Sequence, residues 1–565
     1  MLGRDRNVIS MTEEDESNKE MAATPAVESK DPGTGVQFDC WDPEDDEFWE
    51  ESGKGLANRN LWISIPNLFL GFAIWMVWSV IVTKIQGIHD ANADIYSFSG
   101  WGGLTGDEYK ALLYILPGVA GLAGATFRIT NSFMIEISGG RNVIAATTLL
   151  LLLPMVGAGI ALKDPDVSFT VLIIYALMSG VGGGAFASSM SNISFFYPRK
   201  MQGLSLGLNA GLGNLGVSAM QFSVPVVMGF ALFGGMSGSA IGGYYVGNAA
   251  LLWVPFCAFF MVAAWLWMNN MPEHDVANTA NSLKKYFWLE AIGYMAAGIV
   301  VAGFVATRDS SIFVSPLMGI VRIFIMVGIA VAVTLALMRY ATPGQVKESL
   351  LDQWKIFGKK HNWLMTWLYI MTFGSFIGFS AVFPKLILDV FGYLPDGTDN
   401  PWYDNQALTY SFLGPMVGAA LRPPGGWMAD KWGGARVTHW ATVVMVIATI
   451  GVGLIIVEAQ ASETPQDYFV SFMALFMILF TTTGIGNGST FRMIAIIFPR
   501  KQAGPVLGWT SSIAAYGAFI IPSVFAVSIA AKVPEYAMYG FAAYYVSCLG
   551  VNWWYYARKD AEMPC

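Results

Sequence analysis

Residues 180–218 read GVGGGAFASSMSNISFFYPRKMQGLSLGLNAGLGNLGVS, two apolar segments on either side of the charged turn 198–200. Small residues recur every four positions along both segments, at Gly180, Gly184, Ser188 and Asn192 and then at Gly203, Gly207 and Gly211. Residues four apart lie on one face of a helix, and a glycine face inside lipid lets another helix or a ligand approach the backbone. Because glycine at this density would destabilise a helix exposed to water, the stretch predicts two membrane helices that border a cavity.

The composition of the whole chain supports a membrane protein that crosses the bilayer many times. Of its 565 residues, 55% are hydrophobic and only 13% are charged, whereas soluble domains carry about 25% charged residues. The formal charge of −8 comes largely from acidic residues near the N-terminus, and we expect residues 1–35 to be a solvated, disordered tail. The motif WDPEDDEFW (41–49) differs, because its aromatic residues predict a short piece that docks on the membrane or on loops.

Metal, redox and nucleic-acid chemistry have no motif in this sequence. The chain has four histidines and four cysteines, with the cysteines at Cys40, Cys257, Cys548 and Cys565. This spacing forms neither a disulfide framework nor a metal site. We therefore expect no catalytic residues, no cofactor, no metal site and no nucleic-acid partner; membrane lipid is the expected surrounding.

Apolar runs long enough to cross a hydrocarbon core, which takes about 20 residues, follow one another along the chain. They lie at about 61–83, 108–136, 143–162, 169–196, 203–233, 247–269, 286–307, 316–340, 362–390, 406–429, 437–458, 467–498, 503–531 and 535–557. This makes two sets of six spans with an extra pair at 286–340 between them. The sequence therefore predicts an all-α protein of about 14 transmembrane helices.

The two sets of six repeat each other in sequence. SFFYPRKMQG (194–203) corresponds to AIIFPRKQAG (495–504), and SGGRN (138–142) corresponds to DKWGGAR (430–436). A parallel duplication of six helices, with the substrate between the halves, is the major facilitator arrangement. We divide the chain into an N-terminal tail (1–55), an N-terminal half (56–270), a central linker with two extra helices (271–361), a C-terminal half (362–558) and a C-terminal tail (559–565).

Basic residues cluster on one side of this layout. They are Arg141, Arg199, Lys200, Lys284, Lys285, Lys359, Lys360, Lys431, Arg436, Arg500, Lys501, Arg558 and Lys559. The excess of lysine and arginine marks the cytoplasmic side. Both termini are therefore expected in the cytoplasm, with the protein in the inner, cytoplasmic membrane of the cell.

Two arginines lie deep inside predicted membrane helices. Arg128 is roughly 15 Å from the Gly139 turn and Arg422 roughly 12 Å from Asp430, at 1.5 Å per residue. Each lies on the second helix of its half, so the duplication places the two guanidinium groups opposite each other across the central axis. Their planar fork suits a small trigonal oxyanion. The alternative is that each arginine snorkels to the interface or neutralises a buried acid.

Acidic residues and histidines are absent from the middle of the twelve repeat helices. Proton-coupled carriers usually keep a titratable group in the pathway. With two permanent positive charges and no such group, the empty carrier would reorient reluctantly, which favours anion-for-anion exchange. A proton symporter of the same fold and a passive anion channel remain as alternatives.

Other side chains could complete or border such a site. Phe72, Phe186, Tyr369 and Phe373 are aromatic candidates to surround a flat anion, although plain packing is the commoner role of each. Arg492 follows Gly484 and Gly488 on one helical stripe and could add positive potential to the cytoplasmic mouth, but a gate or loop salt bridge is the simpler interpretation. Arg322, in the extra pair, is expected to be an interfacial or packing residue.

The motifs resemble those of the nitrate/nitrite porter (NarK-type) family of the major facilitator superfamily. GAFASSMSNISFFYP (184–198) with GLNAGLGNLGVS (207–218) is similar to the first nitrate signature of that family, and GIGNGSTFRMIAIIFP (484–499) to the second. WDPEDDEFW, RNLWISIP, ATFRITNSFM and FGSFIGFSAVFPKL also match, so that the resemblance covers residues 41–270 and 353–560. The extra pair at 286–340 is not part of the usual twelve-helix plan.

The resemblance implies a secondary transporter of nitrate and nitrite that is not an enzyme and functions as a monomer. It implies that Arg128 and Arg422 hold the anion, that Asn214 hydrogen-bonds it, and that the four aromatic candidates surround it. It also implies that glycines allow the helices to rock and slide, namely Gly180, Gly184, Gly207, Gly211, Gly213, Gly484, Gly486 and Gly488. Whether transport is nitrate/nitrite antiport or nitrate–proton symport stays open, because the position of Arg492 varies in the family.

Overall fold

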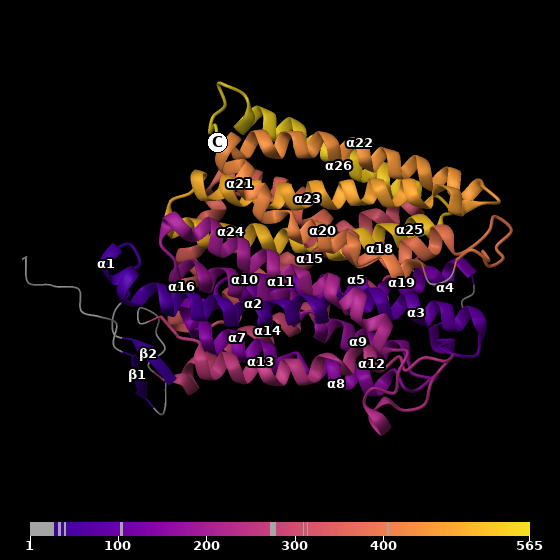
Figure 1. The fold of residues 1–565 in the computed structure, drawn as a ribbon, viewed down its shortest axis with the longest axis horizontal. Coiled ribbons are helices and arrows are strands. Elements are labelled where there is room, and N and C mark those ends of the chain that lie inside the picture. The colour runs from indigo at the N-terminus through magenta and orange to yellow at the C-terminus, as the bar shows by residue number, and fades with distance from the viewer. Residues whose placement is uncertain are drawn as a thin grey trace, which may run out of the picture.

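The computed structural model describes residues 28–31, 35–38, 41–101, 106–271, 278–308, 310–313, 315–403 and 406–565. Residues 1–27 of the predicted tail and Cys40 lie outside this part. The described chain forms a bundle whose helices run along its longest axis, with the earlier helices in the lower part of the view and the later ones in the upper part (Figure 1). A small antiparallel hairpin, β1 (Glu28–Asp31) and β2 (Gly35–Phe38), precedes the bundle.

The hairpin corrects the expectation of a disordered tail for the residues that form it. Composition alone misses the Pro-Gly pair between the two strands, which is a turn-forming sequence. The rest of the predicted tail is not covered by the description, so the expectation of disorder stays a prediction there.

The N-terminal half contains continuous helices and spans that are divided into two consecutive helices. They are α1 (Asp46–Phe48), η1 (Trp49–Gly53), α2 (Lys54–Met76), α3 (Trp78–Ala91), η2 (Ser99–Trp101), α4 (Gly106–Leu113), α5 (Ile115–Asn131), α6 (Met134–Ser138), α7 (Gly140–Leu150), α8 (Leu152–Ala161), α9 (Phe169–Ser179), α10 (Val181–Phe196), α11 (Arg199–Val227), η3 (Gly234–Ser237), α12 (Asn248–Leu251) and α13 (Trp253–Trp267). Several of them, such as α2 and α3, are separated by a single residue and form one long span.

The inserted segment and the C-terminal half follow. The inserted segment contains α14 (Thr279–Ala306), η4 (Ser311–Phe313), α15 (Pro316–Ala341), α16 (Gly344–Gln353) and η5 (Trp354–Gly358). The C-terminal half contains α17 (Lys360–Tyr369), η6 (Ile370–Gly374), α18 (Ser375–Phe391), α19 (Gln406–Tyr410), α20 (Leu413–Ala420), α21 (Arg422–Trp432), α22 (Gly434–Ala461), η7 (Pro465–Tyr468), α23 (Phe469–Ile497), α24 (Arg500–Ala515), α25 (Gly517–Ala530), α26 (Glu535–Asn552) and η8 (Trp553–Ala557).

Eleven helical spans in the described part are long and apolar enough to cross a membrane. Three further predicted spans correspond to α11, to α19–α21 and to α26, which are not among those eleven. The helical, multi-span architecture is thus as expected, while the exact number of 14 stays a prediction. The first span is longer than the predicted 61–83, because α2 and α3 continue from Lys54 to Ala91 with a break only at Val77.

Equivalent turns in the two halves have the same backbone geometry. Gly139 ends α6 with φ of 80°, and Gly433 ends α21 with φ of 91°. This left-handed region strains residues that have a Cβ, which explains the Gly-Gly pairs at both turns. In the same way, α11 begins after Pro198 and α24 after Pro499. We call the end of the bundle that carries these four turns the basic end.

Both terminal segments dock at the basic end (Figure 1). The Trp41 indole donates to the Phe195 carbonyl oxygen (3.0 Å), and Trp49 packs on Tyr197, so the predicted aromatic motif docks on the turn after α10. Lys200 pairs with Asp46, which raises the pKa of Lys200. At the C-terminus the Cys565 carbonyl accepts from the Ala435 amide (2.9 Å).

The inserted pair packs on both halves. Helix α14 lies against α5, α6, α7 and α9 of the N-terminal half, and α15 lies against α5 and against α25 of the C-terminal half. Within the pair, an Arg322 nitrogen donates to the Phe304 carbonyl oxygen (2.6 Å), in keeping with the expected packing role. The inserted pair therefore bridges the two halves of the bundle.

Candidate functional site

Helices α5 and α21 bring Arg128 and Arg422 into the bundle interior, where the two side chains are 0% and 3% exposed. The second predicted helix of the C-terminal half is not continuous; α20 stops at Ala420, and Arg422 is the first residue of α21. The prolines at 423 and 424 explain the break, because proline removes an amide donor and disfavours helical geometry in the residue before it.

Backbone carbonyl groups hold the Arg128 guanidinium from both halves. Its Nε donates to the Gly183 oxygen on α10 (2.8 Å), and its Nη1 donates to the Ser511 oxygen on α24 (3.3 Å). Its Nη2 is buried and has no acceptor in the described part of the chain. Arg128 is therefore anchored along one edge and keeps one donor for another partner.

Arg422 has no acceptor at all among the described residues. Its Nε, Nη1 and Nη2 are all buried and unpaired. Neither Arg422 nor Arg128 forms an ion pair with a carboxylate in the described regions, which argues against the alternative that they neutralise buried acids. Buried donors without acceptors are rare in proteins, and this cluster is suited to an anion with several oxygen atoms.

The Phe373 ring lies between the two guanidinium groups. The Arg128 Cζ is 4.9 Å and the Arg422 Cζ 5.4 Å from its centroid. Phe373 belongs to η6, one turn of π-helix between α17 and α18. Such turns frequently occur at functional sites. The structure thus brings both predicted arginines to a single aromatic ring.

The other predicted aromatic residues extend from this ring in a continuous cluster. Phe186 stacks on Phe373 (5.6 Å) and also lies 4.7 Å from the Arg128 Cζ. Phe72 meets Phe186 edge to face (5.8 Å), and Tyr369 stacks on Phe373 (5.6 Å) with its buried hydroxyl group unpaired in the described residues. These rings make the walls of the site apolar, which strengthens electrostatic interactions there.

Asn214 is buried on α11, where its amide nitrogen donates to the Ala210 carbonyl oxygen (2.6 Å). Its side-chain oxygen has no partner in the described part. No hydrogen bond joins Asn214 to Arg128 or Arg422 in the described structure, so its assignment as an anion ligand stays a prediction.

Sequence reasoning missed several residues at this site. Phe376 lies 4.5 Å from the Arg422 Cζ and Trp75 lies 5.3 Å from the Arg128 Cζ. Their signal was present in the sequence, since Trp75 follows Phe72 and Phe376 follows Phe373 at the spacing of one helical turn. The carbonyl groups of Gly183 and Ser511 gave no sequence signal, because any residue supplies one.

The predicted glycines differ in how closely other helices approach them. In the N-terminal half, a Cβ added at Gly180 would lie 2.6 Å from Ala123, one at Gly184 would lie 2.9 Å from Asn131, and one at Gly213 would lie 2.6 Å from Leu68. In the C-terminal half, a Cβ added at Gly484 would lie 2.3 Å from Gly418, one at Gly486 would lie 2.6 Å from Thr372, and one at Gly488 would lie 2.3 Å from the Arg422 carbonyl oxygen. At Gly211 the nearest atom is 3.5 Å away, and at Gly207 nothing lies within 4 Å in the described part. Close packing against neighbouring backbone therefore requires glycine at Gly180, Gly484 and Gly488, whereas at Gly184, Gly213 and Gly486 a neighbouring side chain would have to move.

Arg492 forms an ion pair with Asp430 at the basic end, which agrees with the salt-bridge interpretation of this residue. The two side chains are 43% and 61% exposed. An exposed ion pair contributes about 0–1 kcal/mol. We therefore expect Arg492→Gln to change the initial rate of transport less than about threefold. A loss comparable with that of an Arg128 variant, in protein purified in equal yield, would place Arg492 in the substrate path.

A buried polar cluster joins the halves at the opposite end. Lys385 and Asp389 of α18 form an ion pair (3.0 Å), and Lys385 also donates to Gln86 of α3. The Tyr114 hydroxyl group, between α4 and α5, donates to Asp389 (2.8 Å). The ion pair lies within α18, and the hydrogen bonds with Gln86 and Tyr114 connect it to the N-terminal half; the sequence analysis did not foresee this cluster.

Asp389→Asn is expected to loosen this end. The change leaves the buried Lys385 ammonium without its carboxylate, and such unpaired buried charges are strongly destabilising. Labelling of a cysteine introduced at Thr83, by an impermeant maleimide in a background without native cysteines, should become about threefold faster or more. Asp396→Asn, in a loop at the same end, is the control. Equal labelling in both variants would show that the Lys385–Asp389 cluster does not hold the end closed.

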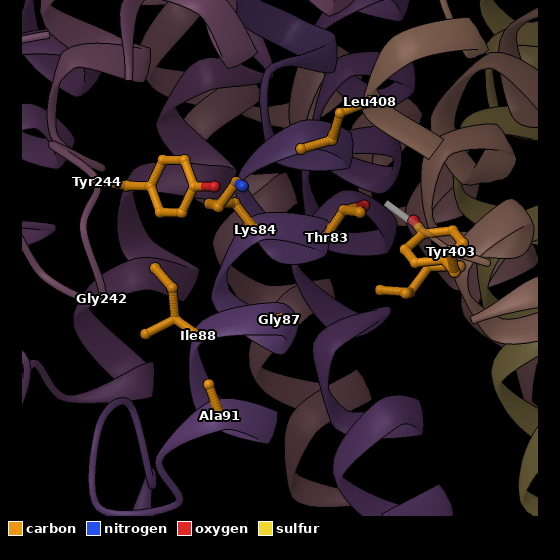
Figure 2. A pocket seen from close by; sticks show the side chains of 10 residues that line it. Thr83, Lys84, Gly87, Ile88, Ala91, Gly242, Tyr244, Tyr403 and Leu408 are labelled. Carbon is orange, nitrogen blue, oxygen red and sulfur yellow. The ribbon is translucent and has the colours of Figure 1, made fainter. Parts of the chain in front are cut away.

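A cavity of about 280 Å³ lies next to this cluster (Figure 2). Its lining includes Thr83, Lys84 and Ile88 of α3 on one side and Tyr403 and Leu408 on the other. Figure 2 shows Lys84 beside the Tyr244 ring, with its ammonium 3.5 Å from the ring centroid. Neither Arg128 nor Arg422 lines the cavity, so it is a vestibule at the opposite end and not the arginine site.

Solved structures confirm the fold class. A D-xylose–proton symporter superposes with a TM-score of 0.55 at 12% identity, over 87% of this chain and 96% of that chain. A peptide transporter solved in complex with sulfate superposes with a TM-score of 0.53 at 15% identity, over 89% of this chain and 96% of that chain. Together with the helical spans, they show a multi-pass helical protein with the major facilitator fold.

Sequence comparison gives the family. The chain is 33% identical to a probable nitrate/nitrite antiporter NarK2 of Thermus thermophilus, over 94% of this chain and 99% of the relative. It is also 33% identical to the nitrate/nitrite transporter NarU of Escherichia coli, over 92% and 96% of the two chains. No family model matches the sequence. The chain belongs to the NarK/NarU nitrate/nitrite transporter family, as its motifs suggested, and is not an enzyme.

Proposed function

We propose that this protein transports nitrate and nitrite across a cell membrane by alternating access, exchanging one for the other. One anion at a time binds between Arg128 and Arg422, against the Phe373 ring. The names of the relatives support the substrates. The observation that carries the proposal is the pair of buried guanidinium groups, which come from equivalent helices of the two halves and have unpaired donors.

Exchange follows from the charge of this site. Two arginines repel each other in an apolar interior, and a bound anion relieves part of that repulsion. Unless another negative charge offsets the arginines, the loaded carrier therefore reorients more readily than the empty one. This couples the outward movement of one anion to the inward movement of the other. A passive channel is disfavoured by the Lys385–Asp389 cluster, which joins the halves at the opposite end. Proton symport gains one specific observation, a buried carboxyl group in the inserted pair, developed below.

The domain division and the orientation fit the same proposal. The two halves (56–270 and 362–558) rock against each other, and the glycines of α10, α11 and α23 act as packing and gating positions. The basic end faces the cytoplasm, because it carries most lysine and arginine residues. The N-terminal segment and the C-terminus, which dock there, are then cytoplasmic, and the monomer is the functional unit in the inner membrane.

Nitrate uptake into proteoliposomes that contain the purified protein tests the proposal. Vesicles are loaded with nitrite or with gluconate, at equal pH on both sides. Exchange predicts rapid uptake with internal nitrite and much slower uptake with gluconate. Equal uptake in both preparations would indicate a channel, and no uptake in either would refute nitrate transport by this protein.

A further inference from the structure

We propose that Glu290 of the inserted helix α14 is a proton-binding site of the transporter, at which one proton binds together with the anion. The inference rests on the proposed function, because it concerns the carrier cycle of the same arginine site. It assigns a role to the inserted pair, which the twelve-helix plan lacks. Glu290 was missed from the sequence because only the twelve repeat helices were searched for titratable groups.

Glu290 is a buried carboxyl group without a cation. Its side chain is 1% exposed, and its Oε1 accepts from the Asn131 amide (3.0 Å) and from the Tyr286 hydroxyl group (3.2 Å). Its Oε2 has no partner in the described residues, and no ion pair joins it there. A carboxylate is costly to bury without a positive partner. The group is therefore suited to hold a proton when the interior is closed.

The charged groups near Glu290 form no ion pair with it in the described part, so Glu290 can bind and release a proton. Tyr286 and Tyr294 lie one turn away on either side along α14. The charged residues of α14 and of the helices packed against it are Lys284 and Lys285 of α14, Arg128 of α5, Glu136 of α6, Arg141 of α7, and Arg322 and Arg339 of α15; α9 contributes Tyr175. No hydrogen bond or ion pair to Glu290 is found for these charged groups in the described part: Arg128 donates to Gly183 and Ser511, and Arg141 to Asn142.

Hydrogen bonds continue from Glu290 towards a small polar cavity. The Tyr286 hydroxyl group, bonded to Glu290, is also bonded to Thr147 of α7 (2.9 Å). Thr147 lines a cavity of about 10 Å³ together with Ser64, Ser188 and Ser189. A polar space of this size holds about one water molecule. Hydroxyl groups and water can pass a proton along such a line, so a proton can move between this cavity and the carboxyl group.

Asn131 links Glu290 to the helix that carries the substrate arginine. Arg128 precedes Asn131 by three residues on α5, and Phe127 of the same helix packs edge to face on Tyr294 of α14 (4.6 Å). Gly293 lets the two helices meet closely, since an added Cβ would lie 2.7 Å from the Phe127 ring. The charge of Glu290 therefore changes the electrostatic potential at the arginine site, because charges interact more strongly in an apolar interior.

The coupling follows from charge balance. In the empty carrier, an ionised Glu290 offsets one of the two arginine charges. When nitrate binds, its charge replaces that of the carboxylate, and Glu290 takes up one proton from the same side of the membrane. The two forms carry the same net charge, so both can reorient. Because linkage is reciprocal, anion binding raises proton affinity by the factor by which protonation raises anion affinity. Net nitrate uptake is then proton-driven, and exchange needs no net proton movement.

Proteoliposomes of wild type, Glu290→Gln and Glu136→Gln separate these modes. One arm contains internal nitrite at equal pH. The other contains internal gluconate with an acidic exterior, a clamped membrane potential and a trapped pH dye. Wild type should show gradient-driven nitrate uptake with internal acidification. Glu290→Gln mimics the protonated form, so it should keep exchange within about twofold and lose gradient-driven uptake at least about tenfold. Glu136→Gln, an exposed carboxyl change near the same helix, should behave as wild type.

Each failure has its own meaning. Wild type with exchange but no gradient-driven uptake, or Glu290→Gln with that uptake intact, would overturn the proton site. Absence of exchange in wild type would instead overturn the proposed function. If Glu290→Gln does not fold, nitrate is added to the purified wild type in weakly buffered detergent solution with a pH indicator. Binding should remove protons from the solution, and nitrate binding without proton uptake would refute the proposal.

Discussion

Arg422→Lys is expected to reduce nitrate transport about 100-fold at low nitrate concentration. All three guanidinium nitrogens of Arg422 are buried without an acceptor among the described residues, so the bound anion is their expected partner. Lysine keeps the charge but replaces the planar fork with a single ammonium group. Losing one charge-assisted hydrogen bond costs up to about 3 kcal/mol, which is about 100-fold in affinity. Initial rates of nitrite-driven nitrate uptake in proteoliposomes measure the effect.

Arg128→Lys should also be severe, but for two reasons. The change removes the free Nη2 donor and also releases the bonds to Gly183 and Ser511, which position the side chain between the halves. Arg436→Lys, an exposed change at the start of α22, is the matched control and should transport normally. Near-normal rates in either buried variant, with the control also normal, would show that the anion does not depend on the arginine forks.

Gly484→Ala is expected to impair both folding and transport. The added Cβ would lie 2.3 Å from the Gly418 carbonyl oxygen, so α23 must move away from α20. Overpacking of this kind typically costs about 1–3 kcal/mol. Because α21, which carries Arg422, packs on α23, this movement would also displace Arg422. We expect a lower midpoint of thermal unfolding in detergent and a transport rate reduced at least about tenfold.

Gly207→Ala provides the contrast on the other glycine-rich segment. Nothing described lies within 4 Å of its added Cβ, and alanine favours helix by about 1 kcal/mol over glycine. This variant should unfold at the same or a higher temperature and transport at a near-normal rate. If both variants lost transport while staying folded, the glycines would serve flexibility during the cycle and not close packing.

The sequence was sufficient for the helical architecture and for placing Arg128 and Arg422 deep in their helices, where the structure buries both side chains. Long apolar runs and an ionisable residue inside such a run are strong signals, because both are visible in the order of residues along the chain. The equivalence of the halves also held in three dimensions, as the positive φ angles of Gly139 and Gly433 show. Backbone geometry requires those glycines at the turns, and the repeated Gly-Gly motif identified the two turns in the sequence.

The other features of the site depend on the three-dimensional structure. The break before Arg422 and the π-helical turn around Phe373 together set how the arginines meet one ring. The two prolines after Arg422 are a sequence signal for the break, whereas the π-helical turn has no reliable pattern. Asp389 lies near a helix end, where acids are usually solvated, yet Lys385 and Tyr114 bury it. Glu290 lies on α14, outside the repeat, where the expectation of no carboxyl group in the middle of the twelve repeat helices did not apply.

Direct binding of nitrate to the purified protein tests the central claim, that the two arginines form one anion site. Isothermal titration calorimetry of wild type, Arg128→Lys, Arg422→Lys and Arg436→Lys gives stoichiometry and affinity without the transport cycle. We predict one nitrate per chain in wild type and in Arg436→Lys, displaced by nitrite, with binding weakened about 100-fold in each of the other two. Nitrate binding with unchanged affinity in Arg128→Lys and Arg422→Lys would contradict the account.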